Sequence, residues 1–269
     1  MLRFLVSVLV LASCKEVQKM AKAQYTVDSA RACLVRQEDT IIFALIERAK
    51  FPLNSPTYNH TFTSISQIQG SLLHFFIRNT EAIQSKAGRY TNPEEIPFFP
   101  ENLPPSVAPY YPSSEFLHSA GALININKDI WKLYFHVLLP MFVASGDDGN
   151  YAQTAAADLT LLQAISRRIH YGRFVAEAKF RETPQIFESL IRAKDRKALM
   201  KVLTLESIEK MVVKRVEKKA MVFGHEVSLE HVKEGTYKVD PSVVSLLYQK
   251  WLIPLTKNVE LEYLLRRLD

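Results

Sequence analysis

Apolar residues recur at helical spacing along most of this chain. Within residues 31–50 they follow the three-to-four-residue repeat of one helix face rather than the alternation of a strand: Leu34, Val35, Ile41, Ile42, Leu45 and Ile46. Glycine occurs only eight times in 269 residues, whereas a barrel or sandwich with many tight turns needs glycine where φ is positive. The sequence therefore predicts an all-α fold.

The helices expected from this spacing form a single domain. They cover residues 31–50, 65–88, 127–144, 151–180, 184–193, 195–202, 205–223 and 241 to near the end, with a kink at Pro254. Residues 92–112 contain seven prolines and several aromatic residues, which predicts a loop packed on the body. Residues 145–150 are typical of a capping turn, because their aspartate spacing is not that of an EF-hand calcium loop. No internal repeat divides the chain, so we expect one large helical-bundle domain over residues 21–269.

Residues 1–20 form a separate N-terminal segment. A basic start followed by the apolar run 4–12 has the parts of a secretory signal peptide; the alternative is a variable leader, with the protein beginning near Met20. The run is too short for a membrane-spanning helix, so no stable membrane association is expected. Two cysteines, Cys14 and Cys33, are too few for a disulfide framework or a cysteine-based metal site. Cys33 is expected to be a buried or half-buried helix residue.

The net charge of +6 and the pI near 9.2 favour an anionic partner. Nucleic acid is disfavoured, since the basic residues of 210–219 are interleaved with acidic ones, as on a solvated helix face. The chain also has no zinc-finger spacing, RNP-like segment or glycine-rich phosphate loop. A small carboxylated or phosphorylated metabolite fits the charge better.

Two cations on one expected helix are candidates for binding such an anion. Arg168 and Lys179 are separated by about three helical turns and share a face, with Gly172 between them. They could seat a dicarboxylate across a gap at the glycine, or form a solvent-exposed basic face. Thr256 and Glu260, at i and i+4, share a face of the last helix. No nucleophile motif or metal-ligand spacing accompanies them, so these patterns indicate an anion-binding helical protein without metal or cofactor.

Several long motifs resemble the plant and fungal chorismate mutases. They are LVRQEDTIIFALIERAKF at residues 34–51, NPEE at 92–95, GDDGNY at 146–151, SRRIHYGRFVAEAKF at 166–180 and IPLTKNVELEYLLRRL at 253–268. The matches extend from about residue 28 to residue 269. The resemblance implies an all-helical homodimer with an active site inside each subunit. It also implies a cofactor-free [3,3] rearrangement of chorismate to prephenate, which supplies phenylalanine and tyrosine.

The resemblance also suggests residue roles. Arg31 and Arg168 match the arginines that bind the two substrate carboxylates, which suits the bidentate guanidinium. Lys179 and a protonated Glu260 match the donors on either side of the breaking ether oxygen, and Glu209 and Thr256 match further substrate contacts. Leu205 replaces a polar residue of the fungal enzyme, so that contact is expected to be absent.

Regulated relatives bind tyrosine or tryptophan at the dimer interface, through an arginine, a Gly-Ser pair and a threonine. Arg89 matches that arginine, but Ala152 and Gln153 stand at the Gly-Ser pair and Ala156 at the threonine. The side chain of Ala152 would crowd the effector backbone, and the other two changes alter its polar contacts. We therefore expect an enzyme largely insensitive to aromatic amino acids, similar to the non-plastid plant isoforms.

Those isoforms are cytosolic, which predicts a cytoplasmic location, with the secretory pathway as the alternative if residues 1–14 are a working signal. The alternative function is a catalytically inactive helical dimer that acts as a binding partner. Loss of a charge among the four main site residues would indicate it, and all four are present: Arg31, Arg168, Lys179 and Glu260.

Overall fold

The computed structural model describes residues 25–60, 70–101, 103–109, 116–225 and 236–269. Over these ranges the regular structure is helical, and strand-type pairing is limited to an isolated antiparallel bridge between His225 and Tyr237. The all-α prediction is confirmed. In the same ranges, no helix combines the length and apolar content required to cross a membrane. The signal-like residues 1–20 lie outside the described part of the chain.

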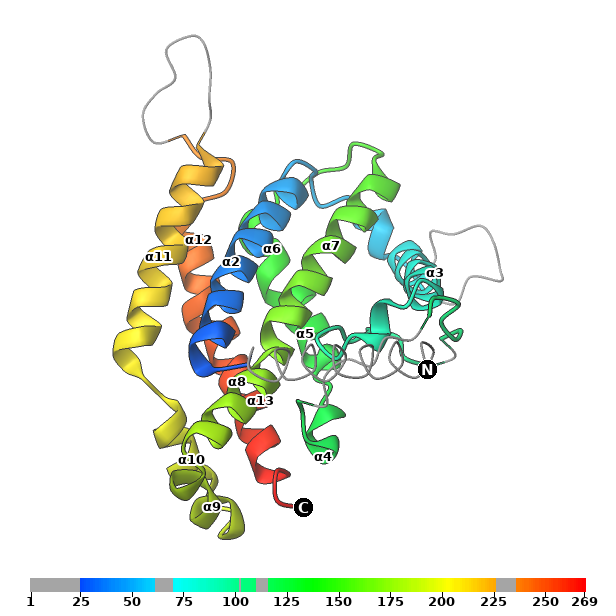
Figure 1. Ribbon diagram of the computed structural model, residues 1–269. Coiled ribbons are helices and arrows are strands. Elements are labelled where there is room, and N and C mark those ends of the chain that lie inside the picture. Colours follow the sequence, from blue (N-terminus) through cyan, green and yellow to red (C-terminus); the bar gives the residue numbers. More distant parts are fainter. Residues whose placement is uncertain (1–24, 61–69, 102, 110–115, 226–235) are drawn as a thin grey trace, which may run out of the picture.

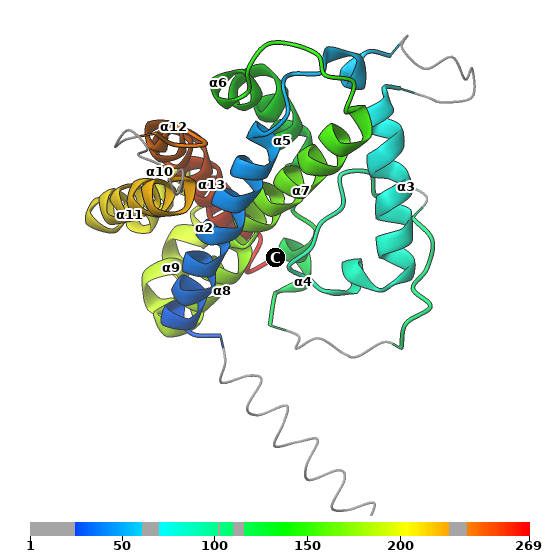
Figure 2. The same ribbon diagram turned by 90° about the horizontal axis from the view of Figure 1, so that it is seen from above.

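The longer helices form the body of the molecule (Figure 1). They are α2 (Val27–Ala49), α3 (Leu72–Lys86), α7 (Tyr151–His170), α8 (Gly172–Glu182), α11 (Glu206–Gly224) and α13 (Ile253–Leu265). Shorter elements connect them: η1 (Ser55–Tyr58), η2 (Arg89–Thr91), α4 (Ser119–Ala122), α5 (Asn127–Leu133), η3 (Tyr134–Leu138), α6 (Leu139–Phe142), α9 (Pro184–Arg192), α10 (Arg196–Leu203), α12 (Pro241–Leu247) and η4 (Tyr248–Leu252). Helices α2 and α7 pack together at the centre, with α3 beyond α7 and α11 beyond α2 (Figure 2).

Three helix boundaries differ from the expected ones. Helix α2 begins at Val27 rather than residue 31, because Thr26 and Ser29 form a reciprocal capping box. Helix α3 begins at Leu72 rather than residue 65, after the capping residue Ser71; residues 61–69 lie outside the described ranges. The expected helix 151–180 divides at Tyr171 into α7 and α8, although the backbone there stays near helical geometry, with φ −61° and ψ −16°.

Two helices contain a π-helical turn just before a proline. The turns are Tyr134–Leu138 before Pro140 and Tyr248–Leu252 before Pro254. In each, the residue preceding the proline donates its N–H to the carbonyl five residues earlier. A proline ring collides with the carbonyl four residues earlier and offers no N–H, and a wider turn accommodates both effects. The kink expected at Pro254 therefore takes the form of a π turn, and the expected helix 127–144 is divided in the same way.

A buried ion pair joins α2 to α7. Arg48 Nε lies 2.5 Å from Asp158 Oδ1, and neither side chain is exposed. The hydroxyls of Tyr58 and Tyr134 also donate to the Asp158 carboxylate, at 2.7 and 2.5 Å, while the Arg48 guanidinium donates to the carbonyl of Phe51. Because burial and the carboxylate disfavour the phenolate, the pKa values of both tyrosines lie above their usual range. Every charge in this part of the core is thus hydrogen-bonded.

The proline-rich loop packs on the body, as predicted. Buried Glu81 on α3 accepts the backbone N–H groups of Phe98 and Phe99, at 2.8 and 2.9 Å, and both rings pack against the main core. Tyr110 and Tyr111 lie outside the described residues.

The turn at residues 145–150 is held by side-chain hydrogen bonds. Asp148 Oδ1 accepts from Asn54 Nδ2 and from the Asn150 N–H. Asn150 occupies the N-cap position of α7, but its side chain makes no capping bond. The aspartates therefore bind the turn itself and the loop after α2, rather than capping the helix.

His170, at the end of α7, is fully buried and neutral. Its Nε2 accepts the Ile126 N–H at 2.9 Å, so Nδ1 carries the proton and donates to the Ser166 carbonyl at 2.8 Å. Burial, together with the nearby charge of Arg173, lowers the pKa of His170 to about 3. The histidine is thus a structural bridge to the segment before α5.

We predict that this histidine contributes to acid instability. The unfolded chain binds a proton near pH 6.5, which the folded chain does not bind until about pH 3. Stability should therefore fall by about 1.4 kcal/mol per pH unit as pH drops through this window. His170→Gln, whose side-chain oxygen can accept the Ile126 N–H, should lose less stability between pH 7 and pH 5 than the wild type in urea unfolding. Equal losses would contradict the assignment.

Candidate active site

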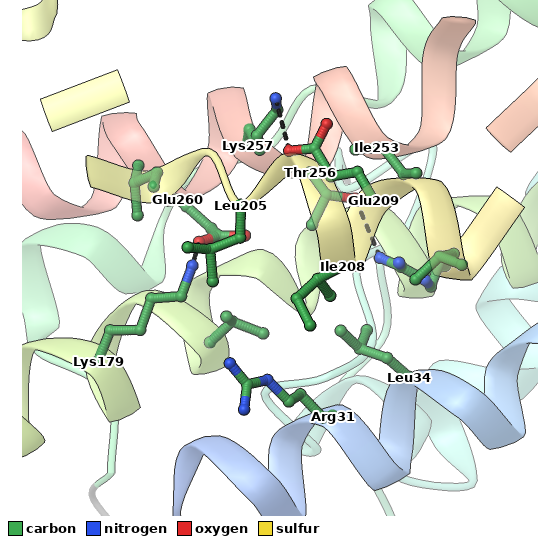
Figure 3. Close-up of a pocket in the computed structure, with 14 residues that line it drawn as sticks. Arg31, Leu34, Lys179, Leu205, Ile208, Glu209, Ile253, Thr256, Lys257 and Glu260 are labelled. Atoms are coloured by element: carbon green, nitrogen blue, oxygen red, sulfur yellow. Dashed lines mark hydrogen bonds and ion pairs between the residues drawn. The ribbon is translucent and has the colours of Figure 1, made fainter. Parts of the chain in front are cut away.

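A cavity of about 110 Å³ lies between α2, α8, α11 and α13, with contributions from α7 and α10 (Figure 3). Six of its lining residues are those predicted from sequence to be catalytic or substrate-binding: Arg31, Arg168, Lys179, Glu209, Thr256 and Glu260. Seven others are apolar: Leu34, Val175, Leu203, Leu205, Ile208, Val212 and Ile253. The remaining one is Lys257. The fold therefore brings together all six predicted positions from five helices.

The charges around the cavity suit an anion. Four basic side chains and two carboxylates line it: Arg31, Arg168, Lys179 and Lys257, against Glu209 and Glu260. The formal excess is two positive charges, which matches a dicarboxylate. Charges in such a partly enclosed space interact more strongly than in open water.

Lys179 and Glu260 form one side of the cavity. Lys179 Nζ, from α8, lies 2.8 Å from Glu260 Oε2, from α13 (Figure 3). Their side chains are 18% and 7% exposed, so both are held away from bulk solvent. The pair places an ammonium and a carboxyl group at one point of the cavity, where both could face a single ligand atom.

Arg168 is the most deeply buried cation of the site. It is 4% exposed, and its only neighbour with a hydrogen bond in the described structure is Thr256, whose Oγ1 accepts from NH1 at 3.1 Å. Its Nε is buried without a partner, and the Tyr248 ring lies 6.0 Å from the guanidinium. Desolvation by burial lowers the pKa of Arg168. A buried guanidinium whose N–H groups are not all hydrogen-bonded can donate to an anionic group.

Lys257 is a site residue that the sequence reasoning missed. Its Nζ lies 2.8 Å from Glu209 Oε1 on α11 and 3.2 Å from Thr204 Oγ1. Lys257 follows Thr256 directly, so the two side chains point about 100° apart around the helix. A pattern of residues four apart that starts at Thr256 therefore does not include Lys257. Only its tertiary contacts with Glu209 and Thr204 identify it as a residue of the cavity.

Arg31 enters the cavity from α2 at its more open side (Figure 3). Its side chain is 45% exposed and pairs with Asp28 at 3.1 Å, an exposed pair that contributes little stability. Leu205 and Ile208, on the α11 side, are 44% and 36% exposed. The cavity thus has an apolar wall on α11, where the resemblance predicts that a polar contact is lost.

Gly172 allows two helices of the site to approach closely. A Cβ at this position would lie 2.7 Å from the Thr256 carbonyl oxygen and 3.4 Å from Glu260 Cγ. Sequence reasoning placed a ligand in the gap at this glycine, and the structure corrects that interpretation, because the backbone of α13 fills it. The burial of Arg168, which is 4% exposed, excludes the solvent-exposed alternative for that residue.

The predicted effector-site residues lie on α7 and in η2, which follows α3. Ala152, Gln153 and Ala156 are exposed on α7. Arg89, in η2, contacts Gln163, two turns after Ala156 on the same helix, through NH1 at 2.6 Å. Its Nε and NH2 both donate to Glu95 Oε2, at 3.2 and 2.9 Å. All three guanidinium nitrogens of Arg89 are therefore engaged within the chain.

Comparisons with known proteins agree with the resemblance. The sequence profile of the family described as chorismate mutase type II matches residues 150–261. Chorismate mutase 2 of Arabidopsis thaliana is 58% identical over 248 residues, which cover 91% of this chain and 94% of that protein. Cytosolic chorismate mutase 2 of Zea mays is 49% identical, over 91% of this chain and 97% of that protein.

A solved structure extends the agreement to three dimensions. The Candida albicans chorismate mutase in complex with L-Trp superposes with a TM-score of 0.86 at 36% sequence identity, covering 92% of this chain and 94% of that one. The helices that carry the cavity residues all lie within the described body of the molecule. Two chorismate mutases are 58% and 49% identical to this chain over nine-tenths of its length, and a third shares its helical fold. The chain therefore belongs to the chorismate mutase family.

Proposed function

We propose that this chain converts chorismate to prephenate in the cavity between α2, α8, α11 and α13. The observation that carries the proposal is the arrangement of four cations and two carboxylates around one partly enclosed space. The reaction is an intramolecular [3,3] rearrangement, so it needs neither a nucleophile nor a metal. Catalysis must come from holding the substrate in its compact conformer and from stabilising the charge that develops as the C–O bond breaks.

The substrate carboxylates are assigned to Arg31, Arg168 and Lys257, because the fourth cation, Lys179, is paired with Glu260. Arg168 has an unused Nε, and the exposed ion pair of Arg31 is easily exchanged for a ligand. Lys257 is joined to Glu209, and a substrate carboxylate can take over part of that interaction. Thr256 accepts from Arg168, so its contribution to substrate binding includes orientation of the guanidinium.

Lys179 and Glu260 are assigned to the breaking ether oxygen. Both lie at one point of the cavity, 2.8 Å apart. As the C–O bond breaks, the oxygen gains negative character and can accept from the Lys179 ammonium and from a protonated Glu260.

Insensitivity to aromatic amino acids is part of the proposal. Ala152, Gln153 and Ala156 lack the groups that contact the effector in regulated relatives, and each guanidinium nitrogen of Arg89 already donates to Glu95 or Gln163. An effector carboxylate at Arg89 would compete with Glu95 and Gln163 for the guanidinium. These features support an unregulated enzyme.

A homodimer and a cytoplasmic location complete the proposal. The family resemblance supports the dimer, and the name of the Zea mays relative, cytosolic chorismate mutase 2, supports the location. The physiological product is then prephenate for phenylalanine and tyrosine synthesis.

We predict saturable loss of chorismate, followed by ultraviolet absorbance, with prephenate as the product. The chain should be tested from Met20 onward, and its dimeric state measured by sedimentation. A folded dimer that fails to consume chorismate would contradict the proposal and favour the alternative of an inactive binding partner.

We predict that Glu260→Gln retains activity at neutral pH and flattens the pH profile, because glutamine keeps a donor at every pH. Glu260→Ala, which removes the donor, should lower kcat by about 10²–10³-fold. Steady-state kinetics across pH measure all three proteins. Loss of all activity in the glutamine variant at every pH would rule out the donor role.

We predict that saturating tryptophan or tyrosine leaves the rate within about twofold of its value without effector, a change of less than about 0.5 kcal/mol in barrier. The same chorismate assay measures it, with a regulated relative as the positive control. A several-fold change in rate would refute the insensitivity while leaving the catalytic proposal intact.

A further inference from the structure

Two threonines share one hydrogen-bond pattern with a neighbouring cation of the cavity. Thr256 Oγ1 lies 2.6 Å from the carbonyl oxygen of Leu252, four residues earlier, and 3.1 Å from Arg168 NH1. A hydroxyl has one proton, and a carbonyl can only accept it. The proton is therefore directed at Leu252, and a lone pair faces the guanidinium.

Thr204 repeats this pattern at Lys257, a partly exposed cation of the cavity. Its Oγ1 lies 2.8 Å from the Met200 carbonyl oxygen, again four residues earlier, and 3.2 Å from Lys257 Nζ. The hydroxyl proton is directed at Met200, which leaves a lone pair for the ammonium. Thr204 lies at the C-cap of α10, two residues before α11 begins. It is not itself one of the described residues that line the cavity.

We infer that Thr204 is a positioning residue that holds the Lys257 ammonium at the substrate cavity. The inference rests on the proposed function, in which Lys257 binds a substrate carboxylate. Lysine has a flexible four-carbon stem with three rotatable donors. One donor is fixed by Thr204 and another is directed at Glu209 Oε1, 2.8 Å away. When a substrate carboxylate competes with Glu209, the bond to Thr204 persists and the ammonium does not swing away.

The hydroxyl is not needed to end α10. The backbone N–H of Thr204 also donates to the Met200 carbonyl, at 3.1 Å. Removing the hydroxyl therefore leaves that carbonyl satisfied, and the extended backbone of Thr204, with φ −86° and ψ 114°, suits a valine. Thr204→Val should fold, while it withdraws the acceptor from Lys257.

The test compares steady-state kinetics of Thr204→Val and Thr204→Ser. The valine variant should raise KM for chorismate by about three- to tenfold, the effect of one lost hydrogen bond, and change kcat by less than about twofold. The serine variant, which keeps the hydroxyl, should restore a wild-type KM. Thr160→Val is the matched control, since Thr160 Oγ1 makes the same bond to the Ala156 carbonyl on the exposed face of α7; it should leave KM unchanged.

A Lys257→Met background decides whether Thr204 acts through Lys257. In that background Thr204→Val should cause no further rise in KM. An equal rise in both backgrounds, or no rise in the wild-type background, would overturn the inference while chorismate turnover by the wild type still upheld the proposed function. Absence of turnover by the wild type would instead refute the proposed function itself.

Discussion

The close approach of α8 and α13 at Gly172 is the contact on which the cavity depends. A side chain there would meet the Thr256 backbone at 2.7 Å, and backbone cannot move aside as a flexible side chain can. With glycine in place, Glu260 comes within 2.8 Å of Lys179, and Thr256 reaches Arg168. The glycine lowers the helical propensity of α8 by about 1 kcal/mol relative to alanine. Close packing of two helices that both carry site residues accounts for its presence.

Buried charges in this protein fall into two groups. In the core, Asp158 is bound by Arg48 and two tyrosines, and Glu177 by Arg181, Arg267 and Tyr263. Breaking such a network is costly because it leaves an unpaired buried charge. Arg168 differs, since among the described residues no carboxylate pairs with it and its Nε lacks a partner. The core charges are satisfied within the chain, while Arg168 is left to be satisfied by a ligand.

Local sequence signals predicted the type of each long element better than its ends. Apolar spacing identified the helices, and the proline content identified the loop after α3, because both depend on neighbouring residues. The division at Tyr171 and the π turn before Pro140 were missed, since the chain stays helical on both sides of them, whereas the kink predicted at Pro254 is the second π turn. The early start of α2 follows from a capping box that pairs only two short side chains.

By itself, the sequence determined the all-helical fold, and its long motifs determined the family and six positions of the cavity. The all-helical fold follows from spacing of three to four residues, which fixes the face of each side chain, and the six positions follow from the family resemblance. Only the tertiary structure decided that Lys257 joins the cavity, that Thr204 lies behind it, and that the gap at Gly172 is filled by α13. These depend on how α10, α11 and α13 pack against one another, and residues far apart in sequence carry no local signal of that packing.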